Sequence, residues 1–302
     1  MLGEVFYWVF NMGIAAAVTG AVVILIGKIK RIPRRFAHIL WLVPFLRMWL
    51  PLGLGSKYSL MSLISNVTTK TVVVYEGHGT FTMMNYIMAA NSYFPITYKI
   101  RLLEDLFGVA SVIWIIVAAA VLVSLGILYA VTKSELSDAS HLRDNVYLSE
   151  KVTSPAVYGV LRPKIVLPAD FANRDLTYIL AHENTHIRNA DNLWRAAAFV
   201  TAAVHWFNPL AWVFLKRFLS ETELACDERV LSRYGEKEKK AYAAALVDCA
   251  EAKSVFASAF GGAKVRVRVD SILSYKKLSL LSGAFFAALA AAILYVLLTN
   301  AA

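Results

Sequence analysis

Four long apolar stretches divide the chain, and each approaches the roughly 20 residues that a helix needs to cross the core of a bilayer. They cover residues 5–26, 36–54, 108–131 and 278–299. The first follows Glu4 rather than a basic segment and is too long for a signal peptide, so we expect it to be retained. The second contains Pro44, Arg47 and Pro51, and we expect Arg47 to reach toward the interface. The pattern predicts four transmembrane helices.

Basic residues in the short loops indicate the orientation of these spans. The loop GKIKRIPRR, residues 27–35, holds five basic residues and no acidic one, so we expect it to be cytoplasmic. Both termini are then outside. The predicted parts are two spans (1–54), an outside loop (55–107), a third span (108–131), a cytoplasmic domain (132–277), and a fourth span with a short tail (278–302).

Composition supports a membrane protein. Hydrophobic residues make up 58% of the chain and charged residues 17%, against about 45–50% and 25% in a typical soluble domain. The net charge of +10 favours contact with anionic lipid headgroups of the bilayer over direct nucleic-acid binding, because the basic residues concentrate on the expected inside. Cys226 and Cys249 fall in the expected reducing compartment, so we expect no disulfide.

The cytoplasmic region is the only part long enough for a chemical domain, and its pattern predicts a mixed α and β fold. Residues 156–168, AVYGVLRPKIVLP, favour an extended stretch, either as ordinary sheet core or as an edge that pairs with an extended peptide substrate. A helix is expected next, with Asn173 as N-cap and Asp175 in its first turn. Its apolar stripe consists of Leu176, Ile179, Leu180 and Ile187.

This helix carries the motif HENTH, residues 182–186. Residues four apart lie on one helix face, about 5–6 Å from each other, so the imidazoles of His182 and His186 can share one metal ion. Glu183 is rotated around the same helix and can act as general base toward a water molecule activated by that ion. Such a short string also arises by chance in a polar helix, so a third ligand carries more weight.

The third ligand is expected in SETELACDERVL, residues 220–231. Catalytic zinc keeps three protein ligands and an open position for water. We assign Glu223 as the third ligand, with a solvated helix acid as the alternative. Asp227, one turn later, is expected to accept a hydrogen bond from the second nitrogen of a liganding histidine. Glu221 and Glu228 lie on another face and are expected to be solvated.

Residues 196–215, AAAFVTAAVHWFNPLAWVFL, are long and apolar enough for a fifth span. A crossing there would put His186 and Glu223 on opposite sides of the membrane, which a shared metal ion forbids. Asn208-Pro209 is suited to end one helix and begin another. We therefore expect a re-entrant or interfacial helical hairpin.

Two further polar residues have weaker claims to the site. His205 lies beside Trp206 in the apolar segment, and a structural role is favoured over a place in the cleft. Asp191 is expected to be a solvated acid at a helix end, with support of a metal ligand as the alternative.

HENTH, the later ELACDE, the intervening HWFNPLAW and the upstream GVLRPKIVLP together resemble the membrane-embedded zinc metalloproteases that include the β-lactam-sensing antirepressors of the BlaR/MecR type. The resemblance covers nearly the whole chain. It implies a gluzincin-like endopeptidase with Zn²⁺ ligands His182, His186 and Glu223, base Glu183, and an active site on the cytoplasmic side of the bacterial inner membrane. Asn184 and Arg188 depart from the usual motif, Asn184 by being more polar and Arg188 by replacing an apolar residue.

The same resemblance implies that the protein senses an outside ligand and then cuts itself before the last span. It further implies cleavage of a cytoplasmic protein, such as a DNA-binding repressor, as a step in antibiotic resistance. Residues 254–262, SVFASAFGG, are suited to be the self-cleavage loop, with a plain linker as the alternative. Such receptors carry a penicillin-binding domain after the final span, where three residues follow here. Either the chain is part of a longer receptor or it is a stand-alone protease.

Two other classes compete with this hypothesis. A non-catalytic receptor or scaffold would keep the fold, but the presence of all three ligands and Glu183 argues against it. A transporter would carry many ionisable residues within its spans, and only Arg47 qualifies. A homodimer is compatible with each class.

Overall fold

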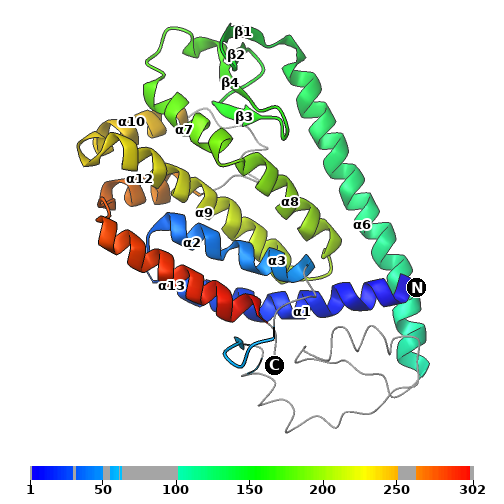
Figure 1. Ribbon diagram of the computed structural model, residues 1–302. Coiled ribbons are helices and arrows are strands. Elements are labelled where there is room, and N and C mark those ends of the chain that lie inside the picture. The colour runs from blue at the N-terminus through cyan, green and yellow to red at the C-terminus, as the bar shows by residue number, and fades with distance from the viewer. Residues whose placement is uncertain are drawn as a thin grey trace. The chain divides into compact units, whose positions relative to one another are not determined.

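The computed structural model describes residues 2–29, 32–49, 55–60, 62, 101–250 and 263–299 (Figure 1). Most of the predicted outside loop and the candidate self-cleavage loop, residues 254–262, lie outside these described residues. The described chain is mainly helical, with one small mixed sheet of four strands.

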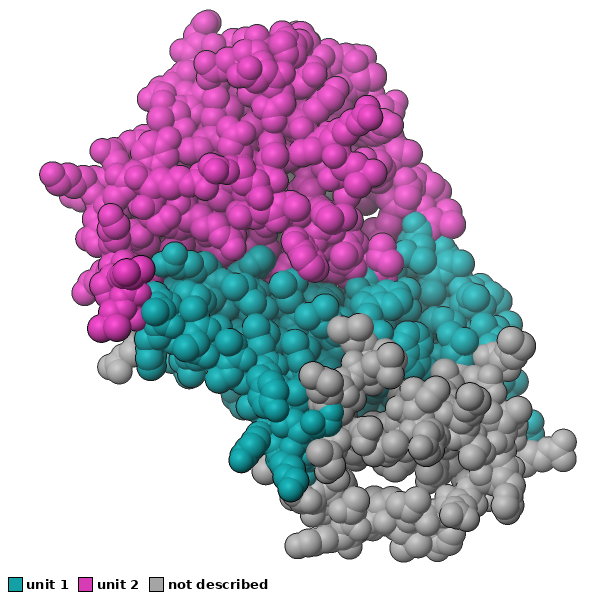
Figure 2. Space-filling model, viewed as in Figure 1, with its two compact units in different colours: residues 1–122, 201–214, 283–302 teal, residues 123–200, 215–282 magenta. Residues whose placement is uncertain are grey.

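The chain divides into two compact units (Figure 2). Unit 1 comprises Met1–Leu122, Thr201–Phe214 and Gly283–Ala302, and unit 2 comprises Val123–Val200 and Leu215–Ser282. Unit 1 holds most of the apolar helices, whereas unit 2 holds the sheet and the HENTH helix.

Three helices in the described residues are long and apolar enough to cross a membrane: α1 (Leu2–Gly27), α6 (Arg101–Glu135) and α13 (Leu280–Leu298). They coincide with the first, third and fourth predicted spans. These helices indicate a multi-pass membrane protein. The orientation of the spans and the domain boundaries stay predictions.

The second predicted span is divided into α2 (Arg34–Leu40) and α3 (Leu42–Trp49), and neither is long enough to cross a bilayer alone. The position of Arg47 relative to a membrane interface stays a prediction, but its side chain is enclosed by protein, with the residue 4% exposed. Its guanidinium donates to the backbone oxygens of Leu297, at 3.0 Å, and Thr299, at 2.6 Å. It thereby satisfies carbonyls that the end of α13 leaves without helical partners.

Helices α8 (Asp191–Val204) and α9 (Pro209–Tyr234) replace the apolar stretch that could have been a fifth span. The predicted break is confirmed. Asn208 Oδ1 accepts a hydrogen bond from the Leu210 amide at 3.0 Å, and α9 begins at Pro209, where a missing N–H costs nothing. In unit 1, α1 approaches the start of α9 at Gly20, where a Cβ atom would lie 2.1 Å from the Phe214 ring.

The sheet contains β1 (Ser140–Arg143), β2 (Val146–Ser149), β3 (Ala156–Tyr158) and β4 (Lys164–Pro168), in the order β1-β2-β4-β3. β2 and β4 are parallel, and the other pairs are antiparallel. The predicted extended stretch is therefore a hairpin of two strands. It turns at Gly159, whose φ of +91° favours glycine. β4 is sheet core, whereas β3 is an edge.

Helix α7 (Thr177–Arg188) packs its apolar stripe against the sheet, through Leu176, Ile179, Leu180 and Ile187. The predicted stripe is thus confirmed, but the predicted N-cap is wrong. The helix begins four residues after Asn173, and Asp175 Oδ1 instead accepts from the amide, at 3.0 Å, and the hydroxyl, at 2.7 Å, of Thr177.

Helices α10 (Lys239–Ala250) and α12 (Val265–Ser274) pack on the second half of α9. Their shared core contains Val230, Leu231, Tyr242, Ala243, Ile272 and Tyr275. Short 3₁₀ turns complete the described elements: η1 (Leu136–Asp138), η2 (Ala169–Phe171) and η3 (Glu236–Glu238). Unit 2 thus surrounds α7 with the sheet on one face and helices on the other.

Candidate metal centre

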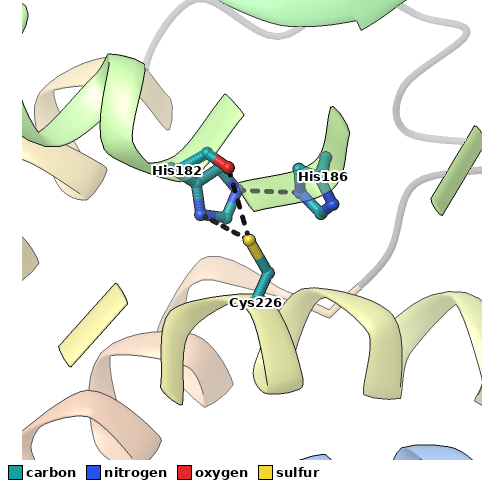
Figure 3. Close-up of side chains that lie close together, drawn as sticks. All are labelled: His182, His186 and Cys226. Atoms are coloured by element: carbon teal, nitrogen blue, oxygen red, sulfur yellow. Dashed lines mark hydrogen bonds between the residues drawn. The ribbon is translucent and has the colours of Figure 1, made fainter. Parts of the chain in front are cut away.

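The two histidines of α7 face each other in the interior of unit 2 (Figure 3). His182 and His186 are 8% and 4% exposed, and their Nε2 atoms are 3.1 Å apart. On α9, Glu223 Oε2 lies 3.5 Å from His182 Nε2, and Glu223 Oε1 lies 3.7 Å from His186 Nε2. Ligand atoms held tetrahedrally at about 2.0–2.1 Å from one zinc ion lie about 3.3 Å from each other. The three side chains are therefore close enough to share one small ion, with a different carboxylate oxygen beside each imidazole.

The position of His186 is fixed by Asp191, the first residue of α8. His186 Nδ1 lies 2.6 Å from Asp191 Oδ2, and Asp191 is 1% exposed. The expectation that Asp191 is a solvated helix-end acid is therefore wrong. The Asp191 carboxylate accepts this hydrogen bond, so Nδ1 of His186 carries a proton and Nε2 is the ring atom that faces His182.

His182 reaches a carboxylate through Tyr242 on α10. Its Nδ1 is 2.9 Å from the Tyr242 hydroxyl, which donates to Asp227 Oδ1 at 2.7 Å. The distance from His182 Nδ1 to Asp227 Oδ1 is 3.4 Å, longer than an ordinary hydrogen bond. Asp227 thus lies beside the histidine as expected, but the tyrosine makes the shorter contact.

These contacts leave two imidazole lone pairs directed at each other. With a proton on Nδ1 of each neutral ring, His182 and His186 present acceptor nitrogens 3.1 Å apart, and two acceptors do not hydrogen-bond. A proton on one of the two Nε2 atoms, which the raised pKa of His186 favours in the metal-free protein, or a metal ion in its place resolves the conflict. The donor set of two nitrogens and a carboxylate oxygen suits zinc.

Two arginines neutralise carboxylates of the site. Arg268, on α12, binds Asp227 through two nitrogens at 2.8 and 2.7 Å and lies 3.2 Å from Glu223. Arg195, on α8, donates to the other Glu223 oxygen at 2.5 Å. The two guanidinium groups thus pair with the carboxylates of Glu223 and Asp227.

The neighbouring charges shift the pKa values of these groups. Burial alone would lower the pKa of His186, but Cys226, Glu223 and Asp191 outweigh it and raise the pKa to about 9. Burial alone would raise the pKa of Asp227, but the Arg268 guanidinium holds it well below the ordinary value. Glu223 is held low in the same way, by His186 and Arg268. The lowered pKa values favour the ionised forms of Asp227 and Glu223.

Cys226 is a second candidate for the third ligand. It is fully buried on α9, with Sγ 3.4 Å from His182 Nδ1, and its thiol donates to the His182 carbonyl at 3.5 Å. Ligand atoms of His182, His186 and Cys226 all lie within 4.8 Å of one another (Figure 3). The sequence predicts only that Cys226 forms no disulfide. Its sulfur lies near the His182 nitrogen that faces away from His186 and also interacts with the His186 side chain, whereas Glu223 approaches the two Nε2 atoms through its two oxygens.

Glu183 lines a cavity of about 200 Å³ next to the histidines. One wall is formed by β3 and the two residues before it. The first turn of α12, with Val265 and Arg268, forms another wall. A third wall is the face of α10 that carries Tyr242, Ala245, Leu246 and Cys249. Asn192 fixes the strand edge, because its Nδ2 donates to the carbonyls of Val157 and Gly159, each at 3.0 Å. The first turn of α8 therefore supplies Asp191 to a histidine, Asn192 to the edge strand and Arg195 to Glu223.

Three predicted polar residues lie elsewhere. His205 is fully buried in unit 1, bonded through Nδ1 to the Thr201 carbonyl and packed against Trp49, so its surroundings are those of a structural residue. Glu221 and Glu228 are each only 9% exposed. The expectation that these two acids are solvated is wrong, because the described part of α9 is enclosed on more than one face.

Comparison of the sequence with known proteins places this chain in a family. Residues 7–268 match the family model described as BlaR1 peptidase M56. The chain is 36% identical over 92 residues to the "Regulatory protein BlaR1" of Bacillus licheniformis, covering 30% of this chain and 15% of that protein. It is 26% identical over 110 residues to the "Methicillin resistance mecR1 protein" of Staphylococcus aureus, covering 35% and 19%. The matched regions thus span less than a fifth of either relative. Since the family model extends over most of the chain, this protein belongs to the BlaR1 peptidase M56 family.

Proposed function

We propose that this protein is an integral-membrane zinc endopeptidase that cleaves proteins on the cytoplasmic side of a bacterial membrane. The observation that carries the proposal is the convergence of one carboxylate on two imidazole Nε2 atoms, at 3.5 and 3.7 Å, beside a cavity that Glu183 lines. Membership of a peptidase family and three candidate membrane helices support it.

His182, His186 and Glu223 would hold the zinc ion. When bound, the ion supplies a Lewis acid that activates water and polarises the scissile carbonyl. Glu183 accepts the proton of the attacking water and delivers it to the leaving amine. Asp191, bonded to Nδ1 of His186, would leave the Nε2 atom of that ring to hold the ion. Arg195 and Arg268 keep Glu223 ionised and in place.

The substrate is proposed to be an extended peptide segment that lies along β3. β3 is an edge strand, and residues 154–157 line the cavity. Strand edges bind peptides by backbone hydrogen bonds. Asn192 already occupies the carbonyls of Val157 and Gly159, so the segment open to a substrate is the stretch just before them.

Self-cleavage between α10 and α12 fits the same cavity. Leu246 and Cys249, in the last turns of α10, and Val265 and Arg268, in α12, all line it. The connecting segment is therefore attached to the cavity wall at both ends, which favours cleavage within the same chain because the local concentration is high. The expected cut lies in residues 254–262. The names of the two relatives support a regulatory role, with a cytoplasmic repressor as a further substrate and an outside signal such as a β-lactam.

The rival function is a receptor or scaffold without turnover. The two are separated by purifying full-length protein in nanodiscs and following its intact mass while measuring zinc content. The wild type should be cut within residues 254–262. Glu183→Gln should keep zinc and remain uncut, whereas Glu150→Gln, an exposed acid of the same unit, should behave as wild type. A wild type that binds zinc but remains uncut would favour the scaffold.

A further inference from the structure

We propose that Tyr242 is a positioning residue that fixes the orientation and the tautomer of His182 at the metal centre. The inference rests on the proposed function. Tyr242 lies 60 positions from His182 and belongs to none of the motifs in the sequence.

The direction of the hydrogen bonds follows from what each group can donate. Asp227 is held ionised by two bonds from Arg268, at 2.8 and 2.7 Å, so it only accepts. The Tyr242 hydroxyl has one proton and must donate it to Asp227, at 2.7 Å. Its remaining contact, 2.9 Å to His182 Nδ1, then requires Nδ1 to be the donor. In the neutral ring this leaves the lone pair on Nε2, the atom that faces His186 and Glu223 and lies 3.2 Å from Arg268 Nη2.

The phenol is held rigidly enough to impose this arrangement. Tyr242 is 2% exposed and packs in the core with Val230, Leu231 and Ile272. The hydrogen bonds from His182 through Tyr242 to Asp227 form a relay. Asp227, at its far end, is fixed as well, because the Arg268 side chain is 12% exposed and binds it through two nitrogens. A hydroxyl between two fixed partners restricts the rotation of the imidazole.

The two histidines are thus oriented from different helices. His186 is bonded directly to a carboxylate from α8, whereas His182 depends on a phenol from α10. Tyr242 also shares the α10 face with Ala245, Leu246 and Cys249, which line the cavity. The helix that contacts the substrate cavity therefore also sets the geometry of one metal ligand.

The test is the zinc affinity of full-length protein in nanodiscs, measured by competition with a chromophoric chelator. Tyr242→Phe keeps the ring in the core and removes only the hydroxyl, and should weaken zinc binding about 10–100-fold. Tyr234→Phe, which removes a phenol hydroxyl from a residue that is 42% exposed, should bind zinc as the wild type does. Unfolding midpoints in excess chelator show whether each variant is folded.

A double-mutant cycle with Asp227→Asn separates positioning from general destabilisation. If Tyr242 and Asp227 act on His182 as one relay, their effects on zinc affinity overlap, and the double variant is little weaker than the worse single variant. Affinity of Tyr242→Phe within twofold of wild type, or losses that multiply in the double variant, would overturn the inference while leaving zinc binding by the wild type intact. If Tyr242→Phe does not fold, Asp227→Asn becomes the test. A zinc affinity of Asp227→Asn equal to that of the wild type would also overturn the inference. A wild type without zinc would remove the proposed function itself.

Discussion

Asp191 accepts a hydrogen bond from Nδ1 of His186 at 2.6 Å, across the turn that separates α7 from α8. The turn passes through Ala190, whose φ of +52° lies in the left-handed region. This reversal returns the chain toward the face of α7 that carries the histidines. One tight turn therefore connects the HENTH helix to the acid that bonds His186.

Removing the acceptor in this pair should weaken the metal centre. Asp191→Asn keeps the size of the side chain but replaces the charged oxygen pair with an amide, so His186 loses its fixed orientation. Zinc affinity should fall about 10–100-fold, as measured by chelator competition. Asp248→Asn, an exposed acid on α10, is the matched control and should leave affinity unchanged. Equal affinities in both variants would show that the contact does not support the site.

The left-handed conformation of Ala190 predicts a stabilising substitution. A non-glycine residue costs about 1–2 kcal/mol in this region, while glycine loses about 0.5–1 kcal/mol more backbone freedom on folding. Ala190→Gly should therefore raise the free energy of unfolding slightly, by up to about 1 kcal/mol. Thermal unfolding in detergent measures it, and a lower midpoint would contradict the backbone assignment.

The choice between Glu223 and Cys226 as third ligand is open to a spectroscopic test. Cobalt bound by a thiolate shows intense charge-transfer absorption in the near ultraviolet, and cobalt bound by nitrogen and oxygen does not. We expect the weak pattern in the wild type and in Cys226→Ser, and loss of stoichiometric binding in Glu223→Gln. Strong near-ultraviolet absorption that disappears in Cys226→Ser would instead assign the sulfur.

The raised pKa of His186, about 9, predicts how pH acts on the metal-free protein. A group whose pKa is higher in the folded state stabilises the fold below its unfolded pKa, about 6.5, and this stability is lost as pH rises through the folded pKa. Chelated protein should therefore unfold at a lower temperature at pH 9 than at pH 6.5. Zinc affinity should rise over the same interval, because the metal displaces the proton. An unfolding temperature that does not fall between these pH values would contradict the charge arrangement around His186.

Gly20 should be intolerant of any side chain. A Cβ atom there would lie 2.1 Å from the Phe214 ring, so Gly20→Val forces α1 and α9 apart or the ring off its rotamer. Overpacking of this kind costs about 1–3 kcal/mol. Gly126→Val is the control, since its Cβ would meet no atom within 4 Å. Thermal unfolding of both variants in nanodiscs checks the difference, and equal midpoints would contradict the packing of unit 1.

Local chemistry explains which features were predictable. The apolar stripe of α7, the break at Asn208-Pro209 and three of the spans follow from residues next to each other in the chain. The division of the second predicted span and the hairpin at Gly159 are likewise local, but the apolar pattern alone hides them. The proximity of Glu223 to both histidines was inferred because one metal ion needs three ligands.

The missed residues depend on long-range packing. Tyr242 and Arg268 lie 60 and 86 positions after His182, and neither stands in a recognisable motif. Asp191 lies only five positions after His186. It was expected to be solvated because helix-end acids usually are, and the backbone reversal at Ala190 is what buries it. Glu221 and Glu228 were misjudged because a single helix does not reveal how many neighbours enclose it.

X-ray absorption of zinc in the purified full-length protein is the most direct test of the metal centre. We predict one zinc ion per chain, with nitrogen and oxygen ligands at about 2.0–2.1 Å, and loss of the ion in His186→Ala. A sulfur ligand at about 2.3 Å would contradict the assignment of Glu223. A wild-type protein that retains no zinc would contradict the account as a whole.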